Sequence, residues 1–129
     1  MKSIPFNRLL ILQMFYTFAG IMYNVGSLLA QRNGQQAWAS TDAVMGVVGI
    51  ALYGLFLSAG LMKNLTLYRV LMGISVVLLG YGGVIKHLLN MGHLELYQSV
   101  WTWAGAITVN GIGLVLNLAA AFGRFSRTT

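Results

Sequence analysis

Four long apolar stretches, separated by short polar connections, constrain this chain more than any other feature. They cover about residues 9–30, 43–62, 68–89 and 100–122. A bilayer core of roughly 30 Å is crossed by a helix of about 20 apolar residues, so each stretch is long enough to span it. We therefore expect an all-α integral membrane protein in which residues 1–129 form a single transmembrane domain. The four helices are predicted to run up-down-up-down in one bundle.

The composition supports a membrane protein rather than a water-soluble one. Charged residues make up 8% of the chain and hydrophobic residues 57%, whereas a soluble domain has about 25% charged residues. The net charge of +6 comes from basic residues that stand singly near the ends of the apolar stretches. This pattern differs from a basic nucleic-acid-binding patch, so no nucleic-acid partner is expected. The chain has no cysteine, which excludes disulfides and thiol chemistry.

The distribution of lysine and arginine predicts the orientation of the helices. One side of the expected bundle carries Lys2, Arg8, Lys63, Arg69, Arg124 and Arg127. The other side carries Arg32 and Lys86. Because cytoplasmic loops carry the excess of basic residues, we expect an inner-membrane protein with both termini in the cytoplasm. The first stretch is longer than the roughly 7–15 apolar residues of a signal peptide, so we expect it to be a retained helix.

Small and polar residues recur at helical spacing and predict which sides of the helices face other helices. In lipid, apolar residues do not mark a core, whereas glycines and amides mark contacts between helices. We expect helix packing at Gly20, Gly46, Gly49, Gly73, Gly80, Gly83 and Gly113. We expect a polar face of the bundle at Gln13, Tyr16, Thr17, Asn24, Asn110 and Asn117. The pattern leaves open whether this face lines a pathway or only holds helices together.

Depth along the helices gives one pairwise prediction. At about 1.5 Å per residue, Gln13 (about five residues from its helix end) and Asn117 (about seven from its own) lie within a few Å of the same level. We therefore predict that Gln13 and Asn117 face each other, or face a partner, in the cytoplasmic half of the membrane.

The segment GYGGVIKHLLNMGHLE, residues 80–95, collects several ionisable side chains. We expect an outer-surface charged cluster of Lys86, His87, His93 and Glu95. Here a helix leaves the membrane, and a lysine can extend to the headgroups. Histidine and glutamate can bind metals, but neither histidine is expected at mid-membrane depth, so no metal site is predicted. Aromatic residues are expected at the two interfaces, with Trp38, Tyr97, Trp101 and Trp103 outside and Tyr68, Phe122 and Phe125 inside.

The two acidic residues argue against proton-coupled transport, which usually requires a carboxylate within the membrane. Asp42 stands where a helix starts and can cap it or pair with Arg32, while Glu95 stands in a loop. The sequence also lacks a catalytic triad, a buried acid pair and a glycine-rich phosphate loop followed by lysine. An enzyme is therefore the least expected class.

These observations favour a non-enzymatic inner-membrane subunit or accessory protein. It would pack through its glycine and amide stripes against itself or a larger membrane complex, in contact with membrane lipid. The sequence requires no cofactor, although its methionines and phenylalanines can line a site for a lipid or a quinone. The alternative is a small oligomeric channel or transporter for an anion or a small polar solute. A single four-helix bundle is too thin to hold a pore, so the alternative requires an oligomer.

Overall fold

The computed structural model describes residues 2–126 and is almost entirely helical. Within that range, the helices long and apolar enough to cross a membrane are Phe6–Arg32, Ala43–Leu61, Leu65–Gly92 and Val100–Phe122. They coincide with the four apolar stretches of the sequence, so the all-α prediction is confirmed. Arg127, which contributed to the predicted orientation, lies outside the described residues.

Three of the stretches each form one regular helix, and the third is composite. The regular helices are α1 (Phe6–Arg32), α2 (Ala43–Leu61) and α5 (Val100–Phe122). The composite one consists of α3 (Leu65–Leu79), the π-helical turn η1 (Gly80–Ile85) and α4 (Lys86–Leu89). The remaining elements are the 3-10 turns η2 (Asn90–Gly92) and η3 (Leu94–Leu96) and the paired parallel strands β1 (Ile4–Pro5) and β2 (Phe125–Ser126).

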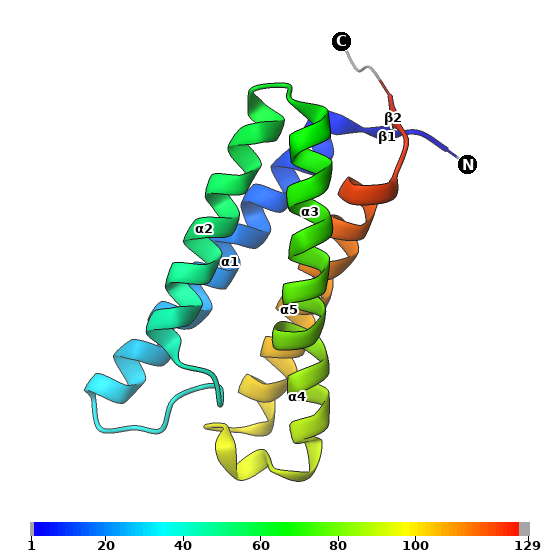
Figure 1. Cartoon of the computed structure of the whole chain (residues 1–129). Helices are drawn as coiled ribbons and strands as arrows, with labels where there is room; N and C mark the ends of the chain where they lie inside the picture. Colours follow the sequence, from blue (N-terminus) through cyan, green and yellow to red (C-terminus); the bar gives the residue numbers. More distant parts are fainter. Residues whose placement is uncertain (1, 127–129) are drawn as a thin grey trace.

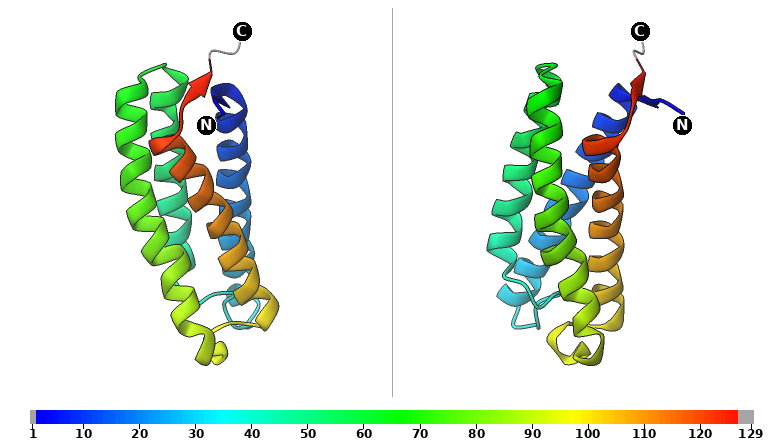
Figure 2. Two further views of the ribbon diagram at one scale, coloured as in Figure 1. Left: turned by 90° about the vertical axis from the view of Figure 1, so that its right-hand side faces the viewer. Right: turned by 45° about the vertical axis from the view of Figure 1, so that its right-hand side comes forward.

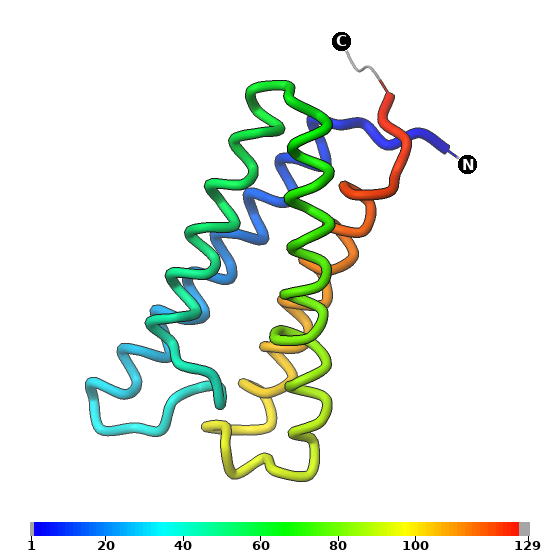
Figure 3. Tube along the Cα trace, viewed as in Figure 1, coloured from blue at the N-terminus to red at the C-terminus, as the bar shows by residue number. Residues whose placement is uncertain are grey.

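The two ends of the bundle differ in what they carry. Figure 1 places both chain ends, the β1–β2 pair and the α2–α3 turn at one end, which we call the terminal end. The connections α1–α2 and α4–α5 lie at the opposite end, the loop end, where Figure 3 shows them beside each other. Hydrogen bonds from Ser40 to Tyr97 and from Asn90 to Ser40 join these connections. Figure 2 shows the long helices packed lengthwise from two further directions.

Polar side chains cap the starts of α2, α3 and, through Ser99, α5. Asp42 Oδ1 accepts a hydrogen bond from the Met45 amide at 3.0 Å, which confirms the predicted cap of α2. Asn64 Oδ1 accepts from the Leu67 amide at 3.1 Å in the same way. This cap lets α3 begin at Leu65, three residues before the expected start at 68.

Two helices end where the chain enters the left-handed backbone region. After α2, Lys63 has φ 58°, its amide donates to the Gly60 carbonyl, and the Asn64 amide donates to the Ala59 carbonyl. This Schellman arrangement satisfies the last carbonyls of α2 and turns the chain directly into α3. Gly34, with φ 76°, ends α1 by the same pattern. A glycine adopts this conformation without steric cost, whereas Lys63 is strained there.

The centre of the bundle contains polar as well as apolar side chains. Gln13, Tyr68, Met72 and Asn117 are fully buried. Many large apolar side chains point outward instead, as does Phe15, which is 68% exposed. The bundle therefore turns its amides inward and much of its apolar surface outward.

Glycines permit close helix approach at four of the seven predicted positions. A Cβ at Gly20 would press on Ile50, and one at Gly46 would overlap Asn24. A Cβ at Gly113 would overlap the ring of Tyr16. The fourth such position is Gly83, which packs against Asn110.

The packing prediction is wrong for two of the other three glycines. Gly49 and Gly73 have no atom of another helix within 4 Å of the place where a Cβ would stand. Gly80 has only an ordinary contact, with Leu114 at 3.7 Å. Helical spacing alone did not distinguish a glycine that faces a neighbouring helix from one that faces open space.

Candidate functional site

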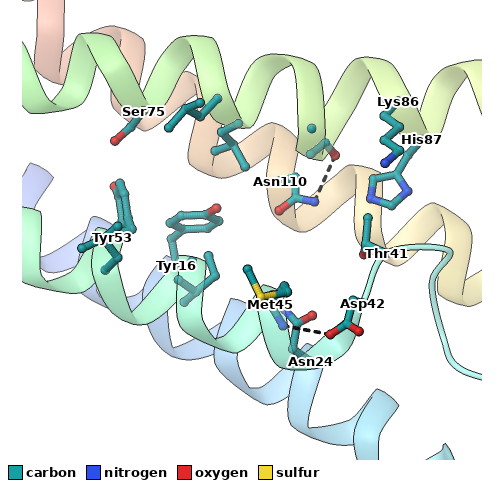
Figure 4. A pocket seen from close by; sticks show the side chains of 18 of the residues that line it. Tyr16, Asn24, Thr41, Asp42, Met45, Tyr53, Ser75, Lys86, His87 and Asn110 are labelled. Carbon is teal, nitrogen blue, oxygen red and sulfur yellow. Dashed lines mark hydrogen bonds between the residues drawn. The ribbon is translucent and has the colours of Figure 1, made fainter.

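A cleft of about 540 Å³ lies between α2 and the composite helix (Figure 4). Its walls include Met45 and Leu52 of α2 and Leu78 of α3, which are exposed on the bundle surface. The cleft therefore opens sideways between these helices, and we call it the lateral cleft. Tyr16 of α1 and Asn110 of α5 form part of its floor. Its volume falls within the range of small-molecule sites, about 300–1,000 Å³.

Missing side chains and an irregular helix create this space. Gly49 and Gly82 line the cleft from opposite walls, and among the described residues no atom outside their own helix backbone lies within 4 Å of either Cβ position. Larger residues at these two positions would fill the cleft. The π-helical turn Gly80–Ile85 belongs to the same wall, and such turns occur frequently at functional sites.

Side chains of α5 hold this irregular wall in place. Asn110 Nδ2 donates to the Gly83 carbonyl at 3.0 Å, and Trp103 Nε1 donates to the His87 carbonyl at 2.8 Å. A π-helical turn shifts the pattern of backbone hydrogen bonds, and a buried carbonyl needs a partner. These two bonds supply partners from a neighbouring helix, so the shape of the wall depends on α5.

Three side chains direct free polar atoms into the lateral cleft. Tyr16 is 4% exposed, and its hydroxyl has no hydrogen-bond partner within residues 2–126. Figure 4 shows this hydroxyl pointing into the space between the helices. Asn110 Oδ1 and His87 Nε2 are likewise without partners in that range, and His87 is 2% exposed. Among the described residues, Asn117 Nδ2 is the one polar atom that is fully buried without a partner, so these three atoms are not sealed off and are open to a polar molecule in the cleft.

Hydrogen bonds at the loop end orient the imidazole of His87. Its Nδ1 lies 2.6 Å from the hydroxyl of Tyr97, which is 2% exposed. The same hydroxyl accepts from Asn90 Nδ2 at 3.2 Å and from Ser40 Oγ at 3.3 Å. We call Ser40, His87, Asn90 and Tyr97 the loop-end cluster. It joins both connections of the loop end to the wall of the cleft.

The mouth of the cleft carries two charges. Asp42 and Lys86 line it from opposite walls, and both are exposed (Figure 4). Across the described ranges of the chain they form no ion pair with each other, and Asp42 forms none with Arg32. Asp42 caps α2 instead. Formal charge is thus confined to the solvent-accessible rim, while the floor has neutral polar groups.

A second polar arrangement, the core polar network, lies deeper in the bundle and consists of Gln13, Tyr53, Tyr68, Met72 and Asn117. Gln13 Nε2 donates to Asn117 Oδ1 at 3.2 Å, which confirms that these two amides face each other. Tyr53 also donates to Asn117 Oδ1, at 2.6 Å, and Tyr68 donates to Gln13 Oε1. Gln13 Nε2 further contacts Met72 Sδ at 3.1 Å. Asn117 Nδ2 is buried without a partner among the described residues.

The residues predicted to form one polar face separate into three groups. Gln13 and Asn117 belong to the core polar network, and Tyr16, Asn24 and Asn110 line the lateral cleft. Thr17 instead donates to the Gln13 carbonyl of its own helix at 2.8 Å. These groups therefore do not form one continuous lining along the bundle.

The prediction of one outer-surface charged cluster is wrong for His87. This residue is buried against Tyr97, because the loop-end connection folds back over the helix. His93 and Glu95 do meet, at 3.2 Å, with both side chains mostly exposed. A hydrogen bond with its own backbone amide, and secondarily His93, lowers the pKa of Glu95. This pair lies in solvent and is separate from the cleft.

Two aromatic residues expected at the membrane interfaces are also buried. Tyr68 packs beside Phe6 and reaches the core polar network, and Tyr97 reaches His87. Trp101 is 82% exposed, as a side chain at an interface would be. The side chain to which a tyrosine hydroxyl binds depends on how each helix is rotated, and composition does not reveal that rotation.

Arg69, considered above as a charge that contributes to orientation, has a structural partner. Its guanidinium donates to the Ala121 carbonyl at 3.1 Å and lies 4.3 Å from the ring centre of Phe125. A cation near a helix C-terminus interacts favourably with its free carbonyls. Arg69 thus fixes the end of α5 against α3 and lies outside the lateral cleft.

Sequence reasoning did not assign Tyr68 and Met72 to a site, or predict that His87 is buried. Tyr68 stands four residues before Met72, so both project from one side of α3. That spacing was a usable signal, but a tyrosine and a methionine are also common on lipid-facing surfaces. Neither residue type by itself indicates contact with a buried glutamine.

A further groove of about 460 Å³ lies at the terminal end, between Phe6, Leu10, Leu65 and Phe125. Its lining is mainly apolar and, among the described residues, does not include Tyr16, His87, Asn110 or Asn117. The lateral cleft is therefore the stronger candidate site.

Comparison of the chain with family models, curated proteins and solved structures found no match. A proposal for its function therefore depends on the lateral cleft, the core polar network and the distribution of charge.

Proposed function

We propose that this chain is a non-enzymatic accessory protein of the inner membrane that holds a membrane amphiphile, a lipid or a quinone, in the lateral cleft. The observation that carries the proposal is a cleft of about 540 Å³, open sideways, into which the buried side chains of His87 and Tyr16 direct polar atoms. A ligand with a polar head and an apolar tail matches a polar floor that opens toward an apolar surface.

The outer surface of the bundle supports the membrane assignment. Large apolar side chains are exposed on this surface, such as Phe15 (68%), Val77 (70%) and Phe122 (73%). A water-soluble monomer rarely exposes so much contiguous apolar surface. We propose that the four helices cross the membrane up-down-up-down, so that this surface contacts lipid.

The distribution of basic residues supports an orientation with both ends in the cytoplasm. Lys63 lies in the α2–α3 turn, Arg69 in the first turns of α3 and Arg124 just before β2, all at the terminal end. Arg32 is the last residue of α1 and Lys86 the first of α4, toward the loop end. The excess of positive charge favours the cytoplasm for the terminal end.

The hydrogen bonds that the amide side chains make within the bundle favour ligand binding over a pore. Gln13 and Asn117 bind each other, and Asn110 binds the backbone of the π-helical turn. A channel through one bundle would need these amides free to replace water around a solute. The same contacts leave fewer stripe residues for assembly, so we place any partner, another copy or a larger membrane complex, against the apolar outer surface.

Native mass spectrometry of the protein released gently from its own membrane tests the proposal. We expect wild-type protein to retain an amphiphile, and Gly49→Leu to lose most of it, because the new side chain fills the cleft. Gly73→Leu is the matched control, since Gly73 also faces open space but does not line the cleft. Equal retention by all three proteins would refute ligand holding in the cleft.

The channel alternative is tested by replacing Asn110 and Asn117 with leucine. If these residues line a pathway between copies, the double variant keeps its oligomeric state and loses solute flux in proteoliposomes. If they stabilise one bundle, as we propose, the variant unfolds more readily and wild-type protein shows no flux.

A further inference from the structure

The hydrogen bonds of the loop-end cluster determine which nitrogen of His87 donates into the cleft. The Tyr97 hydroxyl accepts from Asn90 and from Ser40, so both of its lone pairs are occupied. With the Ser40 and Tyr97 hydroxyls oriented in this way, the Tyr97 proton goes to Nδ1 of His87, 2.6 Å away. A neutral imidazole whose Nδ1 accepts carries its proton on Nε2. The free Nε2–H of His87 is therefore a donor directed into the lateral cleft.

Two other polar groups of the cleft floor, from Tyr16 and Asn110, limit which ligand can bind beside this donor. The Tyr16 hydroxyl can donate a second hydrogen bond, while Asn110 Oδ1 can only accept. None of these three groups carries a formal charge when the imidazole is neutral. An acyl chain laid over them would leave their polar atoms unsatisfied, which is unfavourable.

A charged headgroup fits the depth of the cleft poorly. The charges of Asp42 and Lys86 are at the mouth, and neither forms an ion pair with the other. Burying a charge without a partner costs several kcal/mol or more. The floor thus favours an uncharged head that presents hydrogen-bond acceptors to two donors.

We propose that the lateral cleft binds a quinone-class amphiphile, with His87 Nε2–H and the Tyr16 hydroxyl donating to its carbonyl oxygens and its apolar tail leaving between α2 and α3. This inference rests on the proposed function and names the ligand class of the same cleft. Tyr97 is a positioning residue, because it acts on the ligand only by setting the protonated nitrogen of His87.

Quinone binding tests the two donors. Purified protein in phosphatidylethanolamine nanodiscs is titrated with a benzoquinone that carries a decyl tail, and tryptophan quenching reports binding. Tyr16→Phe removes only a hydroxyl without a partner, so it is expected to fold normally and bind about two- to tenfold more weakly, the worth of one hydrogen bond. His87→Phe is expected to have a similar or larger effect. Tyr81→Phe is the matched control, because Tyr81 is 66% exposed and does not line the cleft.

The role of Tyr97 has a readout that does not depend on binding. The chain has two histidines, so nitrogen NMR of histidine-labelled protein resolves each ring. We expect wild-type His87 to show a protonated Nε2 and an unprotonated Nδ1. Tyr97→Phe is expected to shift the tautomer population toward Nδ1–H and to weaken quinone binding. A wild-type spectrum with a protonated Nδ1 and an unprotonated Nε2 would overturn the assigned donor.

The outcomes separate this inference from the proposed function. If wild type fails to bind the quinone, yet retains a phospholipid that Gly49→Leu loses, the cleft holds an amphiphile and the quinone assignment is wrong. If Tyr16→Phe and His87→Phe both bind the quinone as tightly as wild type, the two donors do not recognise it and the inference is overturned. If Gly49→Leu changes neither quinone nor lipid binding, the proposed function itself fails.

Discussion

Asn117 combines two strong constraints at the scale of a single residue. Its carbonyl oxygen accepts from Gln13 and from Tyr53, while its own amide nitrogen is buried without a partner in the described chain. A buried acceptor shared by two donors is costly to remove: without it the Tyr53 hydroxyl loses its partner and Gln13 Nε2 keeps only Met72 Sδ. The unsatisfied nitrogen adds a further cost to the folded state that a smaller or apolar residue would not have.

Replacing Asn117 with leucine is expected to destabilise the protein by about 1–3 kcal/mol, since the Tyr53 hydroxyl would lose its partner and Gln13 Nε2 would keep only a sulfur acceptor. Tyr53→Phe is expected to cost less, about 0.5–1.5 kcal/mol, because Asn117 would still accept from Gln13. Equilibrium unfolding in mixed micelles measures both. Equal losses of unfolding free energy in the two variants would mean that removing the shared acceptor costs no more than removing one of its donors.

The contact between Gln13 and Asn117 could be predicted from the sequence, because residue depth along two antiparallel helices is simple arithmetic. The burial of Tyr68, Tyr97 and His87 could not be predicted in this way. Each stands near a helix end, where tyrosine and histidine are equally typical of a membrane interface. Their surroundings depend on helix rotation and on how the connections fold back, and both are set by distant parts of the chain.

At the scale of the elements, glycines of the same helix have opposite roles. On α5, a Cβ at Gly113 would overlap the ring of Tyr16, whereas Gly111 faces open space. Tyr16 in turn packs edge-on against Tyr53, with ring centres 5.3 Å apart. The approach of α5 to α1 therefore depends on Gly113 and is independent of Gly111.

Alanine substitution of these two glycines should change stability in opposite directions. Gly113→Ala forces the Tyr16 ring aside and is expected to cost about 1–3 kcal/mol, as overpacked sites do. Gly111→Ala meets no neighbour and is expected to stabilise α5 by about 0.5–1 kcal/mol through helix propensity. Thermal unfolding of both variants checks the signs, and a stabilising Gly113→Ala would contradict the packing described here.

The π-helical turn could not be predicted from its sequence GYGGVI. Glycines in an apolar helix are typical of close packing, and Gly83 does pack against Asn110. Gly82, one residue earlier, faces the cleft instead. The turn depends on partners for displaced carbonyls, which Asn110 and Trp103 supply from α5.

For the whole molecule, the number and extent of the long helices followed from hydropathy alone, because membrane thickness fixes helix length. The lateral cleft could not be predicted from hydropathy, because it arises where α2 and the composite helix are separated beside Gly49 and Gly82. Separation between helices is a property of the assembled bundle. No single stretch of the sequence encodes it.

The proposed orientation can be tested with single cysteines, because the natural chain has none. We expect Gln35→Cys, at the exposed loop end, to react with a membrane-impermeant thiol reagent in intact spheroplasts. Ser3→Cys, at the exposed terminal end, is expected to react only after the membrane is opened. The reverse pattern would place both termini outside the cytoplasm.

The pairing of β1 with β2 brings the segment before α1 and the segment after α5 together, with the Ile4 amide 2.7 Å from the Arg124 carbonyl. A short linker could therefore close the chain into a ring without moving a helix. The turn at Lys63 lies at the same end of the bundle, so a ring opened there would have its new ends on the same side as the old ones (Figure 1). Such a circular permutant would have its helices in the chain order α3, α5, α1, α2 and keep every helix direction. The arrangement of the helices in the bundle is thus expected not to depend on the order in which they are synthesised.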